Sequence, residues 1–160
     1  NLPHIPELLR KNRENAKYFD EHLKDIDGIQ LMKNCDKSTS AYWLYTIRIL
    51  NGKKQAFIDK MKEAGIMVSQ VHNRNDINSC VKDYVEDLPN LDILEKELVC
   101  IPVGWWLSEK DREYIVNNIS HSICYTMKIV FNCAFHAFHN DYFSNIIKEL
   151  EKRKHIVIVT

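Results

Sequence analysis

The sequence has no excess of charge of either sign. Its 160 residues include 22 Lys and Arg and 22 Asp and Glu, so the formal net charge is zero. Proteins that bind nucleic acid through its phosphates need a basic face, and this balance argues against one. Long apolar runs are also missing, because no stretch approaches the ~20 residues of a membrane-spanning helix. We therefore expect neither nucleic acid nor a membrane as a partner.

Signals for secretion, disulfide bonding and metal binding are absent as well. The first residues, Asn1–His4, contain neither the basic nor the apolar region of a secretory signal. The five cysteines are odd in number and widely spaced, and no C-x-x-C pair occurs, so neither a zinc site nor a disulfide framework is favoured. Reduced thiols in a cytoplasmic protein are the simplest interpretation. Because the sequence has no initiator Met, we expect it to be a piece of a longer protein.

The sequence does contain enough apolar residues for a folded core, with 45% hydrophobic and 28% charged residues. Helical spacing of apolar residues predicts three helices, over residues 5–26, 53–64 and 109–119. Short helical pieces are expected between residues 77 and 98, and Ser108 with Asp111 forms a capping box for the last helix. Strands are predicted over residues 41–50, 66–71 and 99–103. The fold class is therefore α+β, with a small mixed or antiparallel sheet flanked by helices.

Aromatic residues gather near two of these strands. Trp105 and Trp106 directly follow the strand at 99–103, and a packing role is favoured for both over a stacking role on a ligand. Tyr42 and Tyr45 are assigned to the core for the same reason.

One stretch concentrates polar chemistry. Val71-His72-Asn73-Arg74-Asn75-Asp76 follows a short apolar run and offers an imidazole, a guanidinium, a carboxylate and two amides. A strand end that delivers such groups into a loop can hold a polar, hydroxyl-rich or anionic ligand. The alternative is a solvated loop whose Asn and Asp residues form turns.

The pattern changes near residue 126, where a second unit begins. A strand is expected over residues 127–131, a helix over 140–153 and another strand over 156–159, which together form a βαβ opening. We thus expect a first domain at residues 1–120, a linker at 121–126 and a Rossmann-like βαβ unit at 127–160. The second unit is too short to bury a core of its own.

Six motifs in order give the first domain a family resemblance. They are the helix with Arg13 to Tyr18, the strand from Ala41 to Tyr45, Ala64-Gly65-Ile66, the His72–Asp76 stretch, Leu88 to Asp92, and Ile101 to Leu107. In this order and spacing, residues 1–120 resemble the C-terminal small domain of the DegT/DnrJ/EryC1/StrS sugar aminotransferases.

The resemblance implies a fold-type I transaminase that uses pyridoxal phosphate and forms a homodimer when full length. Such enzymes transfer an amino group, usually from glutamate, to a nucleotide-linked keto sugar for a surface polysaccharide or another glycoconjugate. The Schiff-base lysine, the carboxylate at the pyridine nitrogen and the phosphate cradle are expected upstream of Asn1, so no catalytic, cofactor-binding or metal-binding residue is assigned to this chain. We expect the chain expressed alone neither to bind the cofactor covalently nor to transaminate.

Transferred residue by residue, the resemblance implies that His72, Arg74, Asn75 and Asp76 line or shape the sugar-nucleotide end of the cleft. The guanidinium of Arg74 is suited to bidentate contacts with phosphate or sugar oxygens. Asp76 is expected either to hold Arg74 or to accept a hydrogen bond from a sugar hydroxyl. His72 is expected either to orient a hydroxyl or to anchor the loop.

Residues 127–160 are similar to the first βαβ unit of glycosyltransferases built from two Rossmann-like domains. Lys154 stands where that pattern expects a glycine, and the loop after the first strand lacks G-x-G-x-x-G. Cys133, His136 and His139 have a spacing that fits no common zinc pattern, so a loop without metal is favoured.

Three interpretations of the whole sequence stay open at this point. The first is the small domain of a sugar aminotransferase joined to a protein of the same pathway. The second is a non-catalytic module for sugar-nucleotide binding or dimer contact. The third explains residues 127–160 as a frameshift or a misjoined gene.

Overall fold

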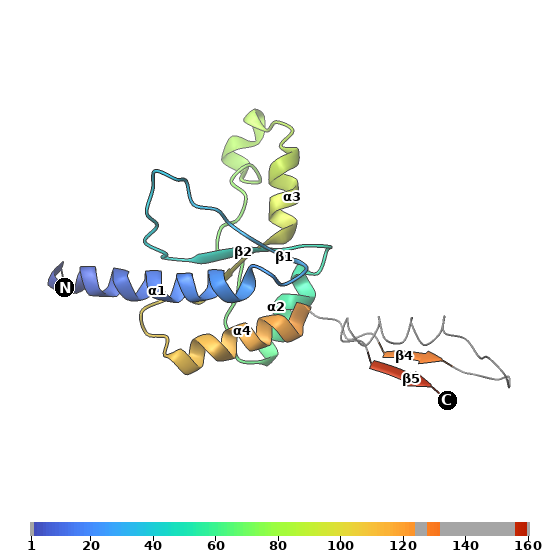
Figure 1. Cartoon of the computed structure of the whole chain (residues 1–160). Coiled ribbons are helices and arrows are strands. Elements are labelled where there is room, and N and C mark those ends of the chain that lie inside the picture. Colours follow the sequence, from blue (N-terminus) through green and yellow to red (C-terminus); the bar gives the residue numbers. More distant parts are fainter. Residues whose placement is uncertain (1, 124–127, 132–155, 160) are drawn as a thin grey trace. The chain divides into compact units, whose positions relative to one another are not determined.

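The computed structural model describes residues 2–123, 128–131 and 156–159 (Figure 1). The chain divides into two compact units, Asn1–Ile123 and Cys124–Thr160. The first unit contains, in order, η1 (Leu2–His4), α1 (Ile5–Leu23), β1 (Ile29–Leu31), β2 (Tyr45–Ile49), α2 (Lys54–Glu63), η2 (Ser79–Tyr84), α3 (Pro89–Glu97), β3 (Leu98–Ile101) and α4 (Glu109–Ile123). Here η denotes a 3-10 helix. In the described part of the chain, no helix is both long and apolar enough to cross a bilayer.

The sheet of the first unit is three-stranded and antiparallel, in the order β1-β2-β3. Ile47 lies at its centre, opposite Leu31 on one side and Val99 on the other. Because side chains alternate along a strand, Tyr45, Ile47 and Ile49 all point to one face, and all three are buried.

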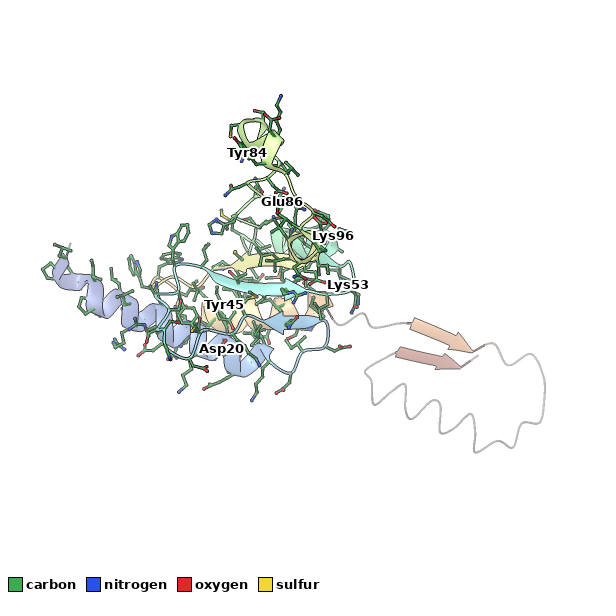
Figure 2. The ribbon with its side chains drawn as sticks, turned by 90° about the horizontal axis from the view of Figure 1, so that it is seen from above. Asp20, Tyr45, Lys53, Tyr84, Glu86 and Lys96 are labelled. Carbon is green, nitrogen blue, oxygen red and sulfur yellow. The ribbon has the colours of Figure 1, made fainter. Side chains whose placement is uncertain are left out.

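Three helices cover this buried face. In Figure 1, α1 and α4 run along one side of the sheet, and α4 packs against both α1 and α2. Their apolar stripes supply the fully buried Phe19, Leu23, Met61 and Ile119. The Tyr45 hydroxyl reaches past this core and donates to Asp20 Oδ1 of α1 at 2.5 Å (Figure 2).

The other face of the sheet carries α3 and a projecting segment. Figure 1 shows α3 and η2 on the side of the sheet opposite α1 and α4. Figure 2 places Tyr84 and Glu86 on this projection. Neither η2 nor α3 contains a buried residue, so this face is not held by a second apolar core.

The predicted helices are confirmed within a few residues of their ends. The capping box is also present, because Ser108 N donates to Asp111 Oδ2 at 2.8 Å and Asp111 N donates to Ser108 Oγ at 3.2 Å. The last helix is longer than expected, since α4 continues to Ile123. Residues 121–123, expected as part of a linker, are therefore helical.

The strand predictions need three corrections. The strand expected at 41–50 begins only at Tyr45, because Tyr42 has φ of +46° and breaks the extended backbone. The strand expected at 66–71 is wrong: the segment forms a single bridge, between Ser69 and Cys100. The strand β1 was not predicted, because its three residues are too few to show an alternating pattern.

The second unit contains β4 (Lys128–Phe131) and β5 (Ile156–Val159), which pair in parallel with Lys128 opposite Ile156. The helix expected at 140–153 and the possible metal ligands Cys133, His136 and His139 lie outside the described residues.

Candidate functional site

The chain enters the polar stretch through a tight turn. Ser69 exchanges two backbone hydrogen bonds with Cys100, at 3.3 and 2.7 Å. One residue later, His72 N donates to Gln70 O at 2.7 Å, and Val71 has φ of +59°. This is a γ-turn centred on Val71. A branched side chain rarely adopts positive φ, so the surrounding contacts must hold this conformation.

Those contacts come from Gln70 and Lys54. Gln70 Nε2 donates to His72 O at 3.0 Å, across the turn. Lys54 Nζ, at the start of α2, donates to Gln70 Oε1 at 2.6 Å and to Glu95 O at 2.5 Å. Desolvation lowers the pKa of Lys54 below its ordinary value, although the Glu95 carboxylate acts in the opposite direction. The turn is thus tied to both α2 and α3.

Arg74 is the centre of a charged cluster. Its Nε donates to Asp76 Oδ1 at 2.9 Å and its Nη2 to Asp76 Oδ2 at 2.5 Å. Its Nη1 bonds to Asp92 and lies 3.6 Å from Glu95 Oε2, so α3 supplies two further carboxylates. The Arg74 and Asp76 side chains are only 14% and 16% exposed. Of the two roles expected for Asp76, the structure contains the first, in which it holds Arg74.

Hydrogen bonding within the cluster shifts the pKa values of both partners. Bonds to Asp76 and then to Asp92 raise the pKa of the Arg74 guanidinium. The bond from Arg74 lowers the pKa of the Asp76 carboxyl below its ordinary 3.8. The ion pair is therefore fully formed at neutral pH, and most Arg74 donors already have partners inside the chain.

His72 and Asn75 differ from Arg74 because both are exposed. The His72 ring lies 6.0 Å from the Trp43 ring, centroid to centroid, and Trp43 is 74% exposed. Asn75 accepts bonds from the Asn78 backbone and side chain at its carbonyl, but within residues 2–123 its amide side chain has no hydrogen-bond partner. The His72 imidazole with its neighbour Trp43, and separately the Asn75 amide, are therefore exposed to solvent on either side of Arg74 in the sequence.

An apolar depression of about 400 Å³ lies next to the turn, with Met67, Val71 and Trp106 among its lining residues. Trp105 and Trp106, for which packing was expected, are 48% and 64% exposed and lie outside the core, although their rings contact each other at 5.9 Å between centroids. Trp106 does cover Gly104, where an added Cβ would lie 2.1 Å from its ring. The assignment of Tyr45 to the core is confirmed, and Tyr42 packs against the edge of that core.

The described residues do not by themselves form a site for pyridoxal phosphate. Asn15 and Ser122 are the buried polar residues in this part of the chain, so it offers no buried carboxylate for a pyridine nitrogen. Lys54, whose pKa is lowered, is already bonded to Gln70 and Glu95. No group of three or more His, Cys, Asp or Glu side chains in residues 2–123 is arranged to hold a metal ion.

Comparison with known proteins assigns this architecture to an enzyme family. The sequence model described as the DegT/DnrJ/EryC1/StrS aminotransferase family matches residues 1–120. No protein among the curated ones compared matches the chain.

Solved structures agree with the family match. The sugar aminotransferase CalS13 from Micromonospora echinospora is 40% identical with a TM-score of 0.72, and the match covers 76% of this chain and 32% of that one. AtS13 from Actinomadura melliaura is 38% identical with a TM-score of 0.71, over 76% of this chain and 32% of its own. PseC from Helicobacter pylori, an aminotransferase of pseudoaminic acid biosynthesis, is 16% identical with a TM-score of 0.69 over 76% and 34%, which shows a shared fold. The chain thus spans about a third of the length of these proteins.

Proposed function

The chain belongs to the DegT/DnrJ/EryC1/StrS aminotransferase family, and on that premise we propose that it serves as the small domain of a sugar transaminase. The substrate of this proposal is a keto sugar linked to a nucleotide, and the amino donor is glutamate. The proposal draws on the family match over residues 1–120 and on the likeness to CalS13, which is named a sugar aminotransferase.

The observation that carries the proposal is the arrangement of the His72–Asp76 stretch. Arg74, which Asp76 holds, ties the stretch to α3, while His72 and Asn75 are exposed to solvent. A sugar offers several hydroxyl groups, each of which donates and accepts, so an imidazole and an amide are suitable partners. We assign substrate contact to His72 and Asn75, and to any donor of Arg74 or acceptor of Asp76 that the ion pair leaves available.

The cofactor of the proposed enzyme is pyridoxal phosphate, which supplies the electron sink for amino transfer. Its binding residues are assigned to parts of the enzyme other than the described residues, because these offer no buried carboxylate for it. Within the proposal, this domain binds and orients the sugar and excludes water from it. A homodimer and a cytoplasmic location belong to the same proposal.

The test is an amino-transfer assay on the product of the full open reading frame that contains this chain. Glutamate and a panel of nucleotide-linked keto sugars are supplied, and formation of 2-oxoglutarate is followed. We expect transfer to at least one sugar, and we expect Asn75→Ala to lower kcat/KM for that sugar by about tenfold, the value of one or two lost hydrogen bonds. Asn117→Ala, on the exposed face of α4, is the matched control. Sugar-nucleotide binding without transfer would instead support the non-catalytic module.

We also propose that residues 127–160 begin a Rossmann-like unit of the glycosyltransferase type. The supporting observation is that β4 and β5 pair in parallel although residues 132–155 separate them. Parallel neighbours require a crossover connection, which is usually a helix. Amide resonances of residues 140–153 with helical chemical shifts would support the unit, and extended shifts there would remove it.

A further inference from the structure

Gln70 uses both ends of its side-chain amide. Its Oε1 accepts from Lys54 Nζ at 2.6 Å, and its Nε2 donates to His72 O at 3.0 Å. An amide can turn end over end, and what fixes its orientation is the chemistry of its partners. An ammonium group only donates, so it selects the oxygen end of Gln70 and directs the nitrogen end toward His72.

Lys54 is itself held in place. Its second bond goes to Glu95 O of α3 at 2.5 Å. The Glu95 carboxylate also lies 3.6 Å from Arg74 Nη1, so Glu95 contacts both Lys54 and the charged cluster around Arg74. The Cys100 thiol of β3 lies 3.7 Å from Gln70 O on the other side. Gln70 is therefore in contact with α2 and β3, and Lys54 links it to α3.

A γ-turn with positive φ at a branched residue needs neighbouring contacts to hold it, and the bonds of Lys54 and Gln70 are such contacts. Val71 has φ of +59° and is 44% exposed, so packing alone does not fix it. We propose that Lys54 and Gln70 are positioning residues, which hold the turn at Val71 and thereby set the direction in which His72 leaves the sheet edge. The positioning role itself does not depend on the proposed function. Its expected consequence, tighter binding of the sugar nucleotide, rests on that function.

Gln70→Glu separates positioning from simple stability. The new carboxylate keeps the contact with Lys54 and strengthens it by adding a charge, but it has no donor for His72 O. Lys54→Met is the complementary variant, since it keeps the length of the side chain and removes its donors. Gln30→Glu, at the exposed position of β1, and Lys17→Met, whose side chain is 78% exposed, are the matched controls.

The experiment measures backbone 15N order parameters and thermal unfolding of the 160-residue chain. In the unaltered chain and both controls we expect Val71 and His72 to have order parameters of about 0.85, the value for rigid backbone. In Gln70→Glu and Lys54→Met we expect these to fall below about 0.6, while β2 and β3 stay rigid and the unfolding midpoint of Gln70→Glu stays within a few degrees of the unaltered chain. Order parameters below about 0.6 at His72 in the unaltered chain, or unchanged values in both variants, would overturn the proposal.

A second readout separates this inference from the proposed function. In the active full-length enzyme, Gln70→Glu is expected to raise KM for the sugar nucleotide several-fold with little change in kcat. An unaltered enzyme that transfers no amino group contradicts the proposed function and leaves the order parameters interpretable. A Gln70→Glu enzyme with unchanged KM contradicts the positioning role instead.

Discussion

The two faces of the small sheet are held by different forces. On the face toward α1, α2 and α4, side chains such as Phe19, Ile47 and Ile119 are fully buried and meet apolar neighbours. On the face toward α3, the contacts are Arg48 with Glu97, Arg74 with Asp76 and Asp92, and Lys54 with Gln70. Apolar burial is strong but non-directional, whereas ion pairs contribute less and fix orientation. The first face thus stabilises the domain, and the second aligns the loop that carries the candidate site.

The largest effect is expected on the apolar face. Phe19 is fully buried and packs edge-on against the Tyr45 ring at 5.3 Å. Phe19→Ala is expected to lower the free energy of unfolding by about 3–5 kcal/mol, through lost burial and the cavity left behind. Denaturant unfolding measures this value. Tyr84→Ala, at a side chain that is 83% exposed, should stay within about 0.5 kcal/mol, and an equal loss in both variants would remove the contrast between the faces.

A smaller effect is expected from the charged face. Arg48 Nε donates to Glu97 Oε2 at 2.7 Å, and the two side chains are 25% and 18% exposed. Glu97→Gln keeps the shape and removes the charge, so we expect a loss of about 1 kcal/mol, near the upper end for ion pairs that solvent still reaches. The loss should shrink in high salt, unlike that of Phe19→Ala. A loss above 3 kcal/mol would place this pair among the principal stabilising contacts and contradict the comparison.

Val71→Gly is expected to change stability still less. Glycine adopts positive φ freely, which relieves strain, but it also gives the unfolded chain more freedom and removes a half-exposed side chain. These terms oppose each other, so we expect the free energy of unfolding to stay within about 0.5–1 kcal/mol. The same variant should increase backbone motion at His72, measured by 15N relaxation. A large loss of stability would mean that Val71 belongs to the core.

Acid is expected to release Asp76 from Arg74 as the Asp76 carboxylate becomes protonated. The pKa of Asp76 in the folded chain lies below its ordinary 3.8. Its stabilising contribution is therefore complete above that pH and is lost as the pH falls through the lowered value. The Arg74 Nε–H resonance should report detachment in this acidic range, while Tyr45 signals stay native. In Asp76→Asn, the Arg74 Nε–H resonance should already have its unpaired position at neutral pH. An Arg74 resonance that does not change with pH in the unaltered chain would contradict the pairing.

Features that depend on residues close together in the sequence could be predicted, and features that depend on residues far apart in the sequence could not. The capping box of Ser108 and Asp111 and the helix started by Pro89 follow from local pattern, and both are present. The strand expected at 66–71 fails because the turn at Val71 depends on Lys54 and Gln70, and apolar periodicity contains no signal for such a contact. Three residues of β1 are likewise too few to show a period.

The candidate site shows the same division. Its polar residues are adjacent in sequence, so His72 to Asp76 stand out at once. Their roles depend on partners far away along the chain: Asp92 for Arg74, Trp43 for His72 and Lys54 for the turn. The loop and the pairing of Arg74 with Asp76 could therefore be predicted from the sequence, whereas the contacts of Arg74 with Asp92 and Glu95 and the position of Trp43 beside His72 could not.

In the proposed enzyme, the His72–Asp76 loop acts on the sugar and not on the cofactor or the amino donor. Single-turnover half-reactions of the full-length enzyme test it most directly, with Arg74→Lys and Asn75→Ala compared against Asn117→Ala. Lysine cannot bridge Asp76 and Asp92 as the guanidinium does. We predict that both loop variants slow the half-reaction with the keto sugar by about tenfold or more and leave cofactor binding and the half-reaction with glutamate unchanged. Equal slowing of both half-reactions, or no slowing of either, would contradict the claim.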